Sequence, residues 1–563
     1  MNQFSRLGFF EILTNSNQAN NGAESEAYVK KTIATSGLKP YTGPWGNEQV
    51  LHLIRRTMFG VTHQDYRFFS KMTLPQCLDV LLTLSPKPAP PVNAYNDKNY
   101  TDPDVPFGKT WVSCPFTDGK GVAGFKRLCS LYGWWVGLML NQDRSITQKM
   151  TLFWSNHFGC ELQYTFDARP SYSYLELLME QALGNFKKLT LAMTTNPGML
   201  QYLSGNESTV EAPNENYSRE MQELFTVGKG PNSHYTQDDV NAAARVLTGW
   251  TTTPNGMKTI YNAAMHDSGD KHFSAFYNNT IIKGRTGKES TNETAELIDM
   301  IFANKETAMH ICRNLYRWFV YSDIDAVVET NIIEPLADIL IKNSFEITPV
   351  LRTLLGSEHF FDALNIGCHI KNPVDYFIGL CRQFNINSFP DDLAKQYNAW
   401  YMLAISLKAQ GMGPGEPPNV AGWPAYYLGP AYYQLWINTD SLVQRECAID
   451  QLLDDRGMQN FGADGALKID ILSFVKQITT VSDISALTDE SSLLLSPVPL
   501  DEAEMQFAGN FLSWPGPAGG PTWPQAWDAY IAAPDNKEAK TLVMGRLKQY
   551  YSYLIKNTQS HLM

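Results

Sequence analysis

One charged segment, residues 213–225, holds side chains that could carry acid–base or metal chemistry. At about 100° per residue, a helix here would place Glu215, Arg219 and Glu223 on one face, with Asn216 and Glu220 beside them. If this face borders a cleft, Arg219 would keep one glutamate ionised, while Glu220 and Glu223 serve as metal ligands or as a general base. We therefore take Arg219, Glu220 and Glu223 as candidate catalytic residues.

The same stripe also has two structural interpretations. Glu215, Arg219 and Glu223 are spaced by four residues, so they could form surface ion pairs worth roughly 0.3–0.5 kcal/mol each. Alternatively, Asn214, Glu215 and Asn216 could join Arg219 in a buried polar network that ties helices together. Loss of Arg219 would then cost about 3–5 kcal/mol. The sequence leaves these interpretations open.

Two histidines could add nitrogen ligands to the glutamates. His157 lies near the end of a predicted helix among aromatic residues, a setting that favours a neutral imidazole. His266 and Asp267 are adjacent in a polar loop. Together with Glu220 and Glu223, these residues would form a nitrogen and oxygen ligand set suited to zinc, iron or manganese. The structural alternatives are a core position for His157 and an ordinary surface loop for His266 and Asp267.

Tryptophan-rich loops suggest a different chemistry. Trp423 lies in a loop of proline, glycine and asparagine, with Trp436 close behind it, and Trp514 and Trp523 lie in a second Pro/Gly loop. Exposed indole rings at these four positions could form stacking platforms for sugars. The alternative is that both loops are rigid covers over helices, because proline-fixed turns bury tryptophan at small entropic cost.

Several well-known catalytic signatures are absent. The sequence contains no H-E-x-x-H, G-x-S-x-G or C-x-x-C motif, and Pro103 stands where a phosphate loop ending at Thr110 would need its first glycine. The eight cysteines are scattered, which is typical of buried small hydrophobic residues. A Cys114–Cys129 disulfide stays open as an alternative for an exported protein.

The overall charge and hydropathy exclude two classes of partner. Lys and Arg number 45 against 57 Asp and Glu, a net charge of −12, so there is no basic patch for nucleic acid. The longest strongly apolar stretch, residues 133–140, is far shorter than the roughly 20 residues of a membrane span. The first residues lack a sustained apolar run, so no signal peptide is predicted.

Helical periodicity and capping signals must position the candidate residues. The pairs Ser145/Gln148 and Thr236/Asp239 have capping-box spacing, and Asn214 is a good N-cap for the charged segment. We therefore expect a mainly α fold, a large multi-helix protein with a single core, long Pro/Gly/aromatic loops and little β-structure.

The chain is expected to have three regions. Residues 1–46 should form an irregular N-terminal arm, residues 47–454 a helical core that carries the motifs, and residues 455–563 a C-terminal helical segment packed on that core. The best strand candidates are residues 259–261 and 280–283, where apolar and polar residues alternate.

Several segments occur together in an order typical of a known family. In chain order they are LIRRTMFG (53–60), FWSNHF (153–158), ALGNF (182–186), NPGML (196–200), PNENYSRE (213–220) with ELFT (223–226), TGW (248–250), HD (266–267) and PPNV (417–420) with GWP (422–424). From about residue 47 to its C-terminus, the chain resembles the bacterial family "domain of unknown function 1800".

The resemblance implies a large, mostly helical and often exported protein with no established activity. Such proteins are frequently encoded beside a sulfatase/phosphatase-like companion, which we take as a candidate partner, and self-assembly stays open. The resemblance implies an envelope or extracellular location, whereas the lack of a visible signal would fit the cytoplasm if the start of the chain is native.

Three functions are compatible with these patterns. The favoured one is a metal-dependent, hydrolase-like enzyme of the cell envelope or exterior, in which a divalent ion held by the Glu/Arg/His cluster lowers the pKa of a bound water to about 7. The alternatives are a non-catalytic structural or scaffolding surface protein and a glycan-binding protein. The choice depends on which side chains converge when the helices pack.

Overall fold

Helices account for most of the computed structural model, which describes residues 36–117, 119, 121–386, 392–458, 467–514 and 519–563. The first helices are α2 (Asn47–Thr57), α3 (His63–Phe69), α4 (Leu74–Leu81), α5 (Gly121–Leu140), α6 (Thr147–His157), α7 (Ala168–Glu180), α8 (Phe186–Thr194), α9 (Pro197–Tyr202), α10 (Glu215–Glu220) and α11 (Gln237–Val246). They are followed by α12 (Asn292–Ala303), α13 (Lys305–Phe319), α14 (Ala326–Val328), α15 (Glu334–Lys342), α16 (Ile347–Leu355), α17 (Pro373–Gln383), α18 (Leu393–Ala409), α19 (Thr439–Leu453), α20 (Ile471–Val475), α21 (Ile484–Leu495), α22 (Glu502–Ser513), α23 (Trp523–Ala532) and α24 (Lys537–Lys556).

Shorter helical turns connect these helices. The 3-10 turns are η3 (Gly205–Glu207), η5 (Ala263–Met265), η6 (Ala275–Tyr277), η7 (Gly287–Thr291), η9 (Ala363–Asn365), η10 (Pro424–Tyr426), η11 (Tyr432–Trp436) and η12 (Thr558–His561), and the π-helical turns are η4 (Met221–Phe225) and η8 (Glu329–Ile333).

The β-structure of the described residues is confined to two antiparallel hairpins. Strand β1 (Trp250–Thr252) pairs with β2 (Thr259–Tyr261), with Thr251 opposite Ile260. Strand β3 (Lys271–His272) pairs with β4 (Ile281–Ile282). Both predicted strand segments are therefore confirmed, and so is the mainly α class.

Local capping signals predicted two of three helix starts. Asn214 caps α10 by accepting a hydrogen bond from the backbone of Asn216, and Thr236 forms a capping box with Asp239 at α11. The third expectation is wrong, because α6 begins at Thr147 and Gln148 does not reach back to Ser145. Instead the Ser145 hydroxyl accepts a hydrogen bond from the backbone N–H of Thr147, and the Gln148 amide does not bond to Ser145.

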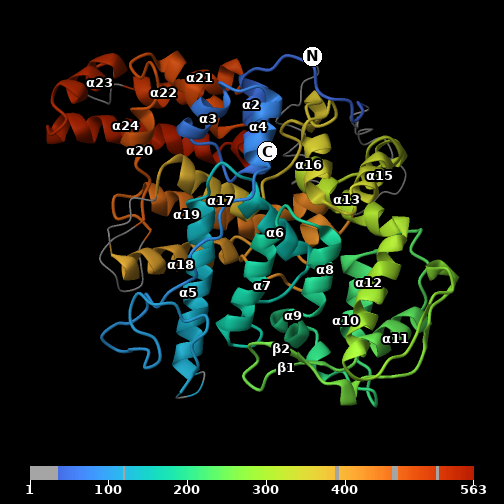
Figure 1. Ribbon diagram of the computed structural model, residues 1–563. Helices are drawn as coiled ribbons and strands as arrows, with labels where there is room; N and C mark the ends of the chain where they lie inside the picture. The colour runs from blue at the N-terminus through green and yellow to red at the C-terminus, as the bar shows by residue number, and fades with distance from the viewer. Residues whose placement is uncertain (1–35, 118, 120, 387–391, 459–466, 515–518) are drawn as a thin grey trace, which may run out of the picture. The chain divides into compact units, whose positions relative to one another are not determined.

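Two glycines let α18 lie unusually close to α5 (Figure 1). A Cβ on Gly133 would meet the backbone carbonyl of Tyr397 at 2.8 Å, and a Cβ on Gly137 would meet the ring of Trp400 at 2.6 Å. Most of the apolar stretch of residues 133–140 is buried in the protein interior. Among the described helices, none combines the length and hydropathy that a membrane crossing requires.

The described residues from 36 onward form one compact unit, and the C-terminal helices contact the N-terminal ones within it. Arg55 of α2 donates to the carbonyl of Ser496, just beyond the C-terminal end of α21. His63 lies edge-on to the ring of Phe474 in α20, at 4.7 Å between centroids. A buried guanidinium at a helix C-terminus is stabilised by the negative end of the helix dipole.

Two sequence expectations concern segments that are only partly described. Of the expected irregular arm, residues 36–46 form no helix, and the backbone N–H of Tyr41 donates to Gly356; residues 1–35 lie outside the described residues. Residues 459–466, near the start of the expected C-terminal segment, also lie outside them. The eight cysteines all lie within the described residues and are free, so Cys114 and Cys129 form no disulfide.

The close approach of α5 and α18 gives a stability prediction. Gly133→Ala should lower the free energy of unfolding by about 1–2 kcal/mol, because the backbone of α18 must move and the cost of overpacking exceeds the gain in helix propensity. Gly545→Ala in α24 is the matched control, since a Cβ there would meet nothing within 4 Å. It should raise stability by up to about 1 kcal/mol. Urea unfolding of both variants measures these changes, and equal effects would contradict the packing account.

Candidate functional site

The charged segment does not continue as a regular α-helix. Helix α10 ends at Glu220, and the turn Met221–Phe225 is π-helical. Backbone hydrogen bonds in a π-helical turn join residues five apart rather than four apart. Glu220 is the last residue of α10, and Glu223 lies within the turn. Such π-helical turns are rare and are frequent at functional sites.

Two buried histidines stabilise the end of this turn. The Nε2–H of His157 donates to the carbonyl of Phe225 at 3.0 Å, and that of His310 donates to Leu224 at 3.0 Å. Asn314 donates to the other ring nitrogen of His157, at 3.5 Å. Protein groups therefore bond to both ring nitrogens of His157. This is the core position given above as the alternative to a metal ligand.

Burial keeps both imidazoles neutral. Burial, followed by the nearby His310, lowers the pKa of His157 to about 3. Burial likewise lowers the pKa of His310 to about 4. Because the charged form is strongly disfavoured in this apolar setting, the hydrogen bonds to the π-helical turn persist at neutral pH.

The acidic stripe separates into two groups. Arg219 bonds to Glu215 at 2.8 Å and to Gln237 at 2.8 Å, but the Arg219 and Glu215 side chains are 37% and 44% exposed. An exposed pair of this kind is worth about 0–1 kcal/mol, so Arg219 is not part of a buried network. Asn214 and Asn216 serve as the N-terminal cap of α10.

Glu220 and Glu223 form the second group, which is less exposed. Burial and then the negative charge of Glu223 raise the pKa of Glu220 above its ordinary value. Glu223 forms an ion pair with Lys229. Two neighbouring carboxylates, one of them poorly hydrated, are the part of the predicted cluster that the fold brings together.

His266 and Asp267 have other partners. His266 lies 3.2 Å from Glu293, and Glu293 also bonds to Lys271 at 2.5 Å, all within the protein interior. Asp267 forms a two-point ion pair with Arg245, at 2.6 and 3.0 Å. This loop is therefore held by structural ion pairs.

The five predicted metal ligands thus fall into three sets: His157, the pair Glu220 and Glu223, and the pair His266 and Asp267. Within the described part of the chain, no three His, Cys, Asp or Glu side chains are placed to hold a metal ion together.

A different set of motif residues converges at the C-terminal end of α6. The side-chain oxygen of Asn156 accepts a hydrogen bond from the backbone of Trp423 at 2.9 Å. Gly422 has φ of +83°, and a Cβ on it would lie 2.4 Å from the same oxygen. A Cβ on Gly159 would lie 2.4 Å from the carbonyl of Val420. The segment FWSNHFG and the loop that ends in GWP therefore interlock with no room for larger residues.

Beside this junction lies a cavity of about 490 Å³, which we call the α18–α19 cavity. It is bordered by the chain after α6, the C-terminal end of α18, the loop at 411–424, the turn η11 and the start of α19. Its lining residues are Glu161, Gln163, Lys408, Gln410, Gly411, Gly413, Glu416, Pro417, Pro418, Trp423, Pro424, Ala425, Leu435, Trp436, Asn438 and Ser441.

The polar groups of this cavity include two carboxylates, a lysine and a buried amide. Glu416 forms an ion pair with Lys408 at 2.7 Å, and Glu161 accepts from Gln163 at 2.5 Å. Gln410 is buried, and its side-chain oxygen accepts no hydrogen bond from the described residues. A buried acceptor without a donor is costly and is a natural contact for a ligand.

The four predicted tryptophans are divided between sites. Trp423 and Trp436 both line the α18–α19 cavity. Trp523 is fully buried, donates to the carbonyl of Val481 at 2.7 Å and stacks on Trp527, so it belongs to the core of the C-terminal helices. Trp514 is exposed and does not line this cavity.

Sequence reasoning missed the other polar residues of the cavity. Glu161, Gln163 and Gln410 belong to no spacing pattern, and they meet only because α6 and α18 end at the same place. The sequence offers a signal only for Glu416, which directly precedes the Pro-Pro pair of the tryptophan loop.

The buried histidine predicts how stability depends on pH. The folded-state pKa of His157 is about 3, below the value near 6.5 of an unfolded chain, so the unfolded state binds the proton first. Stability contributed by the neutral ring is present above pH 6.5 and is lost as the pH falls toward 3. Between pH 7 and pH 5, wild type should therefore lose about 2 kcal/mol more than His157→Gln.

Urea unfolding at both pH values measures this difference. If wild type and His157→Gln lost the same free energy of unfolding, His157 would not be a buried neutral cap of the π-helical turn.

No curated protein and no solved structure matches this chain. A family model, described as "Protein of unknown function (DUF1800)", matches residues 52–535, which include α6, the π-helical turn and the tryptophan loop. The chain therefore belongs to the DUF1800 family.

Proposed function

We propose that this protein binds carbohydrate in the α18–α19 cavity. The observation that carries the proposal is that Trp423 and Trp436, which are 2% and 6% exposed, contribute to the wall of one cavity together with carboxylate, amide and hydroxyl groups. This is the glycan-binding alternative of the sequence analysis, restricted to two of its four tryptophans.

The size and lining of the cavity support a sugar ligand. Its volume of about 490 Å³ falls within the roughly 300–1,000 Å³ of small-ligand sites. Indole rings pack well against the C–H faces of a sugar ring, whereas the carboxylates of Glu161 and Glu416 can accept hydrogen bonds from its hydroxyl groups. The side-chain oxygen of Gln410 offers a further, unsatisfied acceptor.

The carboxylates of Glu161 and Glu416 both lie near the phenol of Tyr132. Burial and then the charges of Glu416 and Glu161 raise the pKa of the Tyr132 phenol well above its ordinary value. Because Glu416 is balanced by Lys408, the cavity is polar without a large net charge, as suits a neutral polyhydroxylated ligand. Such a ligand is consistent with the envelope or extracellular location implied by the family resemblance.

Binding of carbohydrate should depend on the cavity and not on tryptophan in general. In calorimetric titrations with soluble oligosaccharides of hexose, N-acetylhexosamine and uronic acid units, wild type should bind at least one of them. Gln410→Met should weaken this binding by about fivefold, the equivalent of about 1 kcal/mol. The melting temperature should change little, because the replaced oxygen has no partner and the lost hydrogen bond from Nε2 to Ser406 is long, at 3.3 Å. Trp436→Leu should weaken it further.

The exposed Trp514 supplies the matched control, because Trp514→Leu removes an indole outside the cavity. If Trp514→Leu weakened binding as much as Trp436→Leu, or if no oligosaccharide bound, the proposal would be wrong.

A metal-dependent hydrolase is the second candidate, and one observation favours it. Glu220 and Glu223 lie close enough for the charge of one to raise the pKa of the other, and a divalent ion would relieve this repulsion. On this hypothesis the ion would be zinc, iron or manganese, held by this pair and by further ligands such as water.

Metal analysis of the purified protein tests this second candidate. It predicts about one equivalent of zinc, iron or manganese per chain, and loss of that metal in Glu223→Gln. The exposed Glu215→Gln should retain the metal. Metal-free wild-type protein, prepared without chelators, would contradict the hydrolase hypothesis and leave the carbohydrate proposal unaffected.

A further inference from the structure

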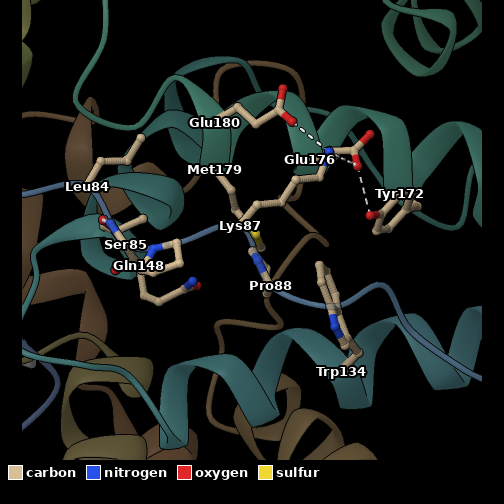
Figure 2. A pocket seen from close by; sticks show the side chains of 12 residues that line it. Leu84, Ser85, Lys87, Pro88, Trp134, Gln148, Tyr172, Glu176, Met179 and Glu180 are labelled. Atoms are coloured by element: carbon tan, nitrogen blue, oxygen red, sulfur yellow. Dashed lines mark hydrogen bonds and ion pairs between the residues drawn. The ribbon is translucent and has the colours of Figure 1, made fainter.

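A second cavity, of about 120 Å³, lies between the start of α6, the middle of α7 and the chain at 84–88 (Figure 2). This cavity and the α18–α19 cavity share no lining residue, so they are separate sites. Its walls are largely apolar and include Trp134, Met179 and the two prolines that flank Lys87. A cavity of roughly 150 Å³ holds a benzene ring, so this slightly smaller one suits at most a single small ring or a short alkyl group.

The mouth of this cavity already binds an ammonium group. Figure 2 shows Lys87 reaching toward α7, where its Nζ lies 2.7 Å from Glu176 and 2.7 Å from Glu180. The Tyr172 hydroxyl donates to Glu176 at 2.9 Å and so holds that carboxylate in place. These two carboxylates raise the pKa of Lys87, which shows how strongly the arrangement favours a positive charge.

Lys87 is nevertheless a weakly held occupant. Its side chain is 56% exposed, and exposed ion pairs contribute only about 0–1 kcal/mol because water and salt screen them. Two carboxylates face one lysine, so the mouth has a net negative charge. A ligand ammonium could therefore replace Lys87 between Glu176 and Glu180 at little cost.

The floor of the cavity contains an unsatisfied polar group. Gln148, at the start of α6, is 7% exposed, and its side-chain oxygen accepts no hydrogen bond from the described residues. Figure 2 shows its amide directed toward Pro88, which also lines the cavity. Gln148 forms no capping box with Ser145. Because a buried acceptor without a donor is unfavourable, a ligand N–H or O–H at this point would be stabilised.

We propose that this cavity is a binding site for a small organic ammonium compound, with an apolar ring against Trp134 and Met179 and its ammonium between Glu176 and Glu180. In this arrangement Lys87 is an internal competitor that occupies the ammonium position when the site is empty. The site is independent of the carbohydrate proposal.

Titration of the full chain with benzylamine tests the site. Calorimetry or ligand-observed NMR should detect saturable binding by wild type, and Lys87→Ala should bind several-fold more tightly because the competitor is removed. The double variant Glu176→Gln, Glu180→Gln should bind several-fold more weakly. Benzyl alcohol, which lacks the charge, should bind less well than benzylamine to wild type.

Lys305→Ala is the matched control, because Lys305 forms a comparable exposed ion pair with Asp338 at 2.8 Å. It should leave benzylamine binding unchanged. Absence of saturable binding in both wild type and Lys87→Ala, unchanged affinity in the double glutamine variant, or equal binding of benzyl alcohol would each overturn the proposal.

A peptide lysine carries the same ammonium group but no ring. N-acetyl-lysine methylamide in the same titration distinguishes the two sources. Weaker binding than benzylamine supports a small organic ligand, and tighter binding would overturn that assignment in favour of a peptide side chain.

Discussion

The candidate site depends on one constraint, the close fit between the end of α6 and the tryptophan loop. Asn156 holds the backbone of Trp423, and Gly159 and Gly422 allow the two segments to approach without side chains between them. If the loop moved away, Trp423 would leave the cavity wall, and the cavity would lose its shape. Asn156 and the two glycines at this junction therefore determine where the indole rings lie.

The same end of α6 connects the tryptophan loop to the acidic segment. His157 follows Asn156 and bonds to the carbonyl of Phe225, which the π-helical turn leaves available. Thus adjacent residues of one motif stabilise two different loops. Just before the π-helical turn, in α10, Arg219 forms a half-exposed ion pair with Glu215, whereas Glu220 is poorly hydrated.

Local sequence signals predicted the secondary structure well but the site only in part. Asn214 and the pair Thr236/Asp239 could be recognised because a helix cap depends on residues three or fewer positions away. The π-helical turn could not, because its carbonyls are satisfied by His157 and His310 from distant helices. Regular helical geometry therefore predicted an α-helix where residues 221–225 form a π-helical turn.

Residue type alone also did not separate core from cavity. Trp523 and Trp436 lie in similar Pro/Gly-rich surroundings in the sequence, yet one stacks in the core of the C-terminal helices and the other lines the cavity. His266 and Asp267 carry ligand-type side chains. However, Arg245 forms an ion pair with Asp267, and Lys271 forms one with Glu293 beside His266. Such outcomes depend on tertiary partners that spacing does not reveal.

A structure of the protein with a bound oligosaccharide tests the central claim most directly. The account predicts a sugar ring in contact with the indole of Trp436, with a hydroxyl group within hydrogen-bond distance of the Gln410 side-chain oxygen. A sugar bound at another surface, with the α18–α19 cavity holding only solvent, would contradict it.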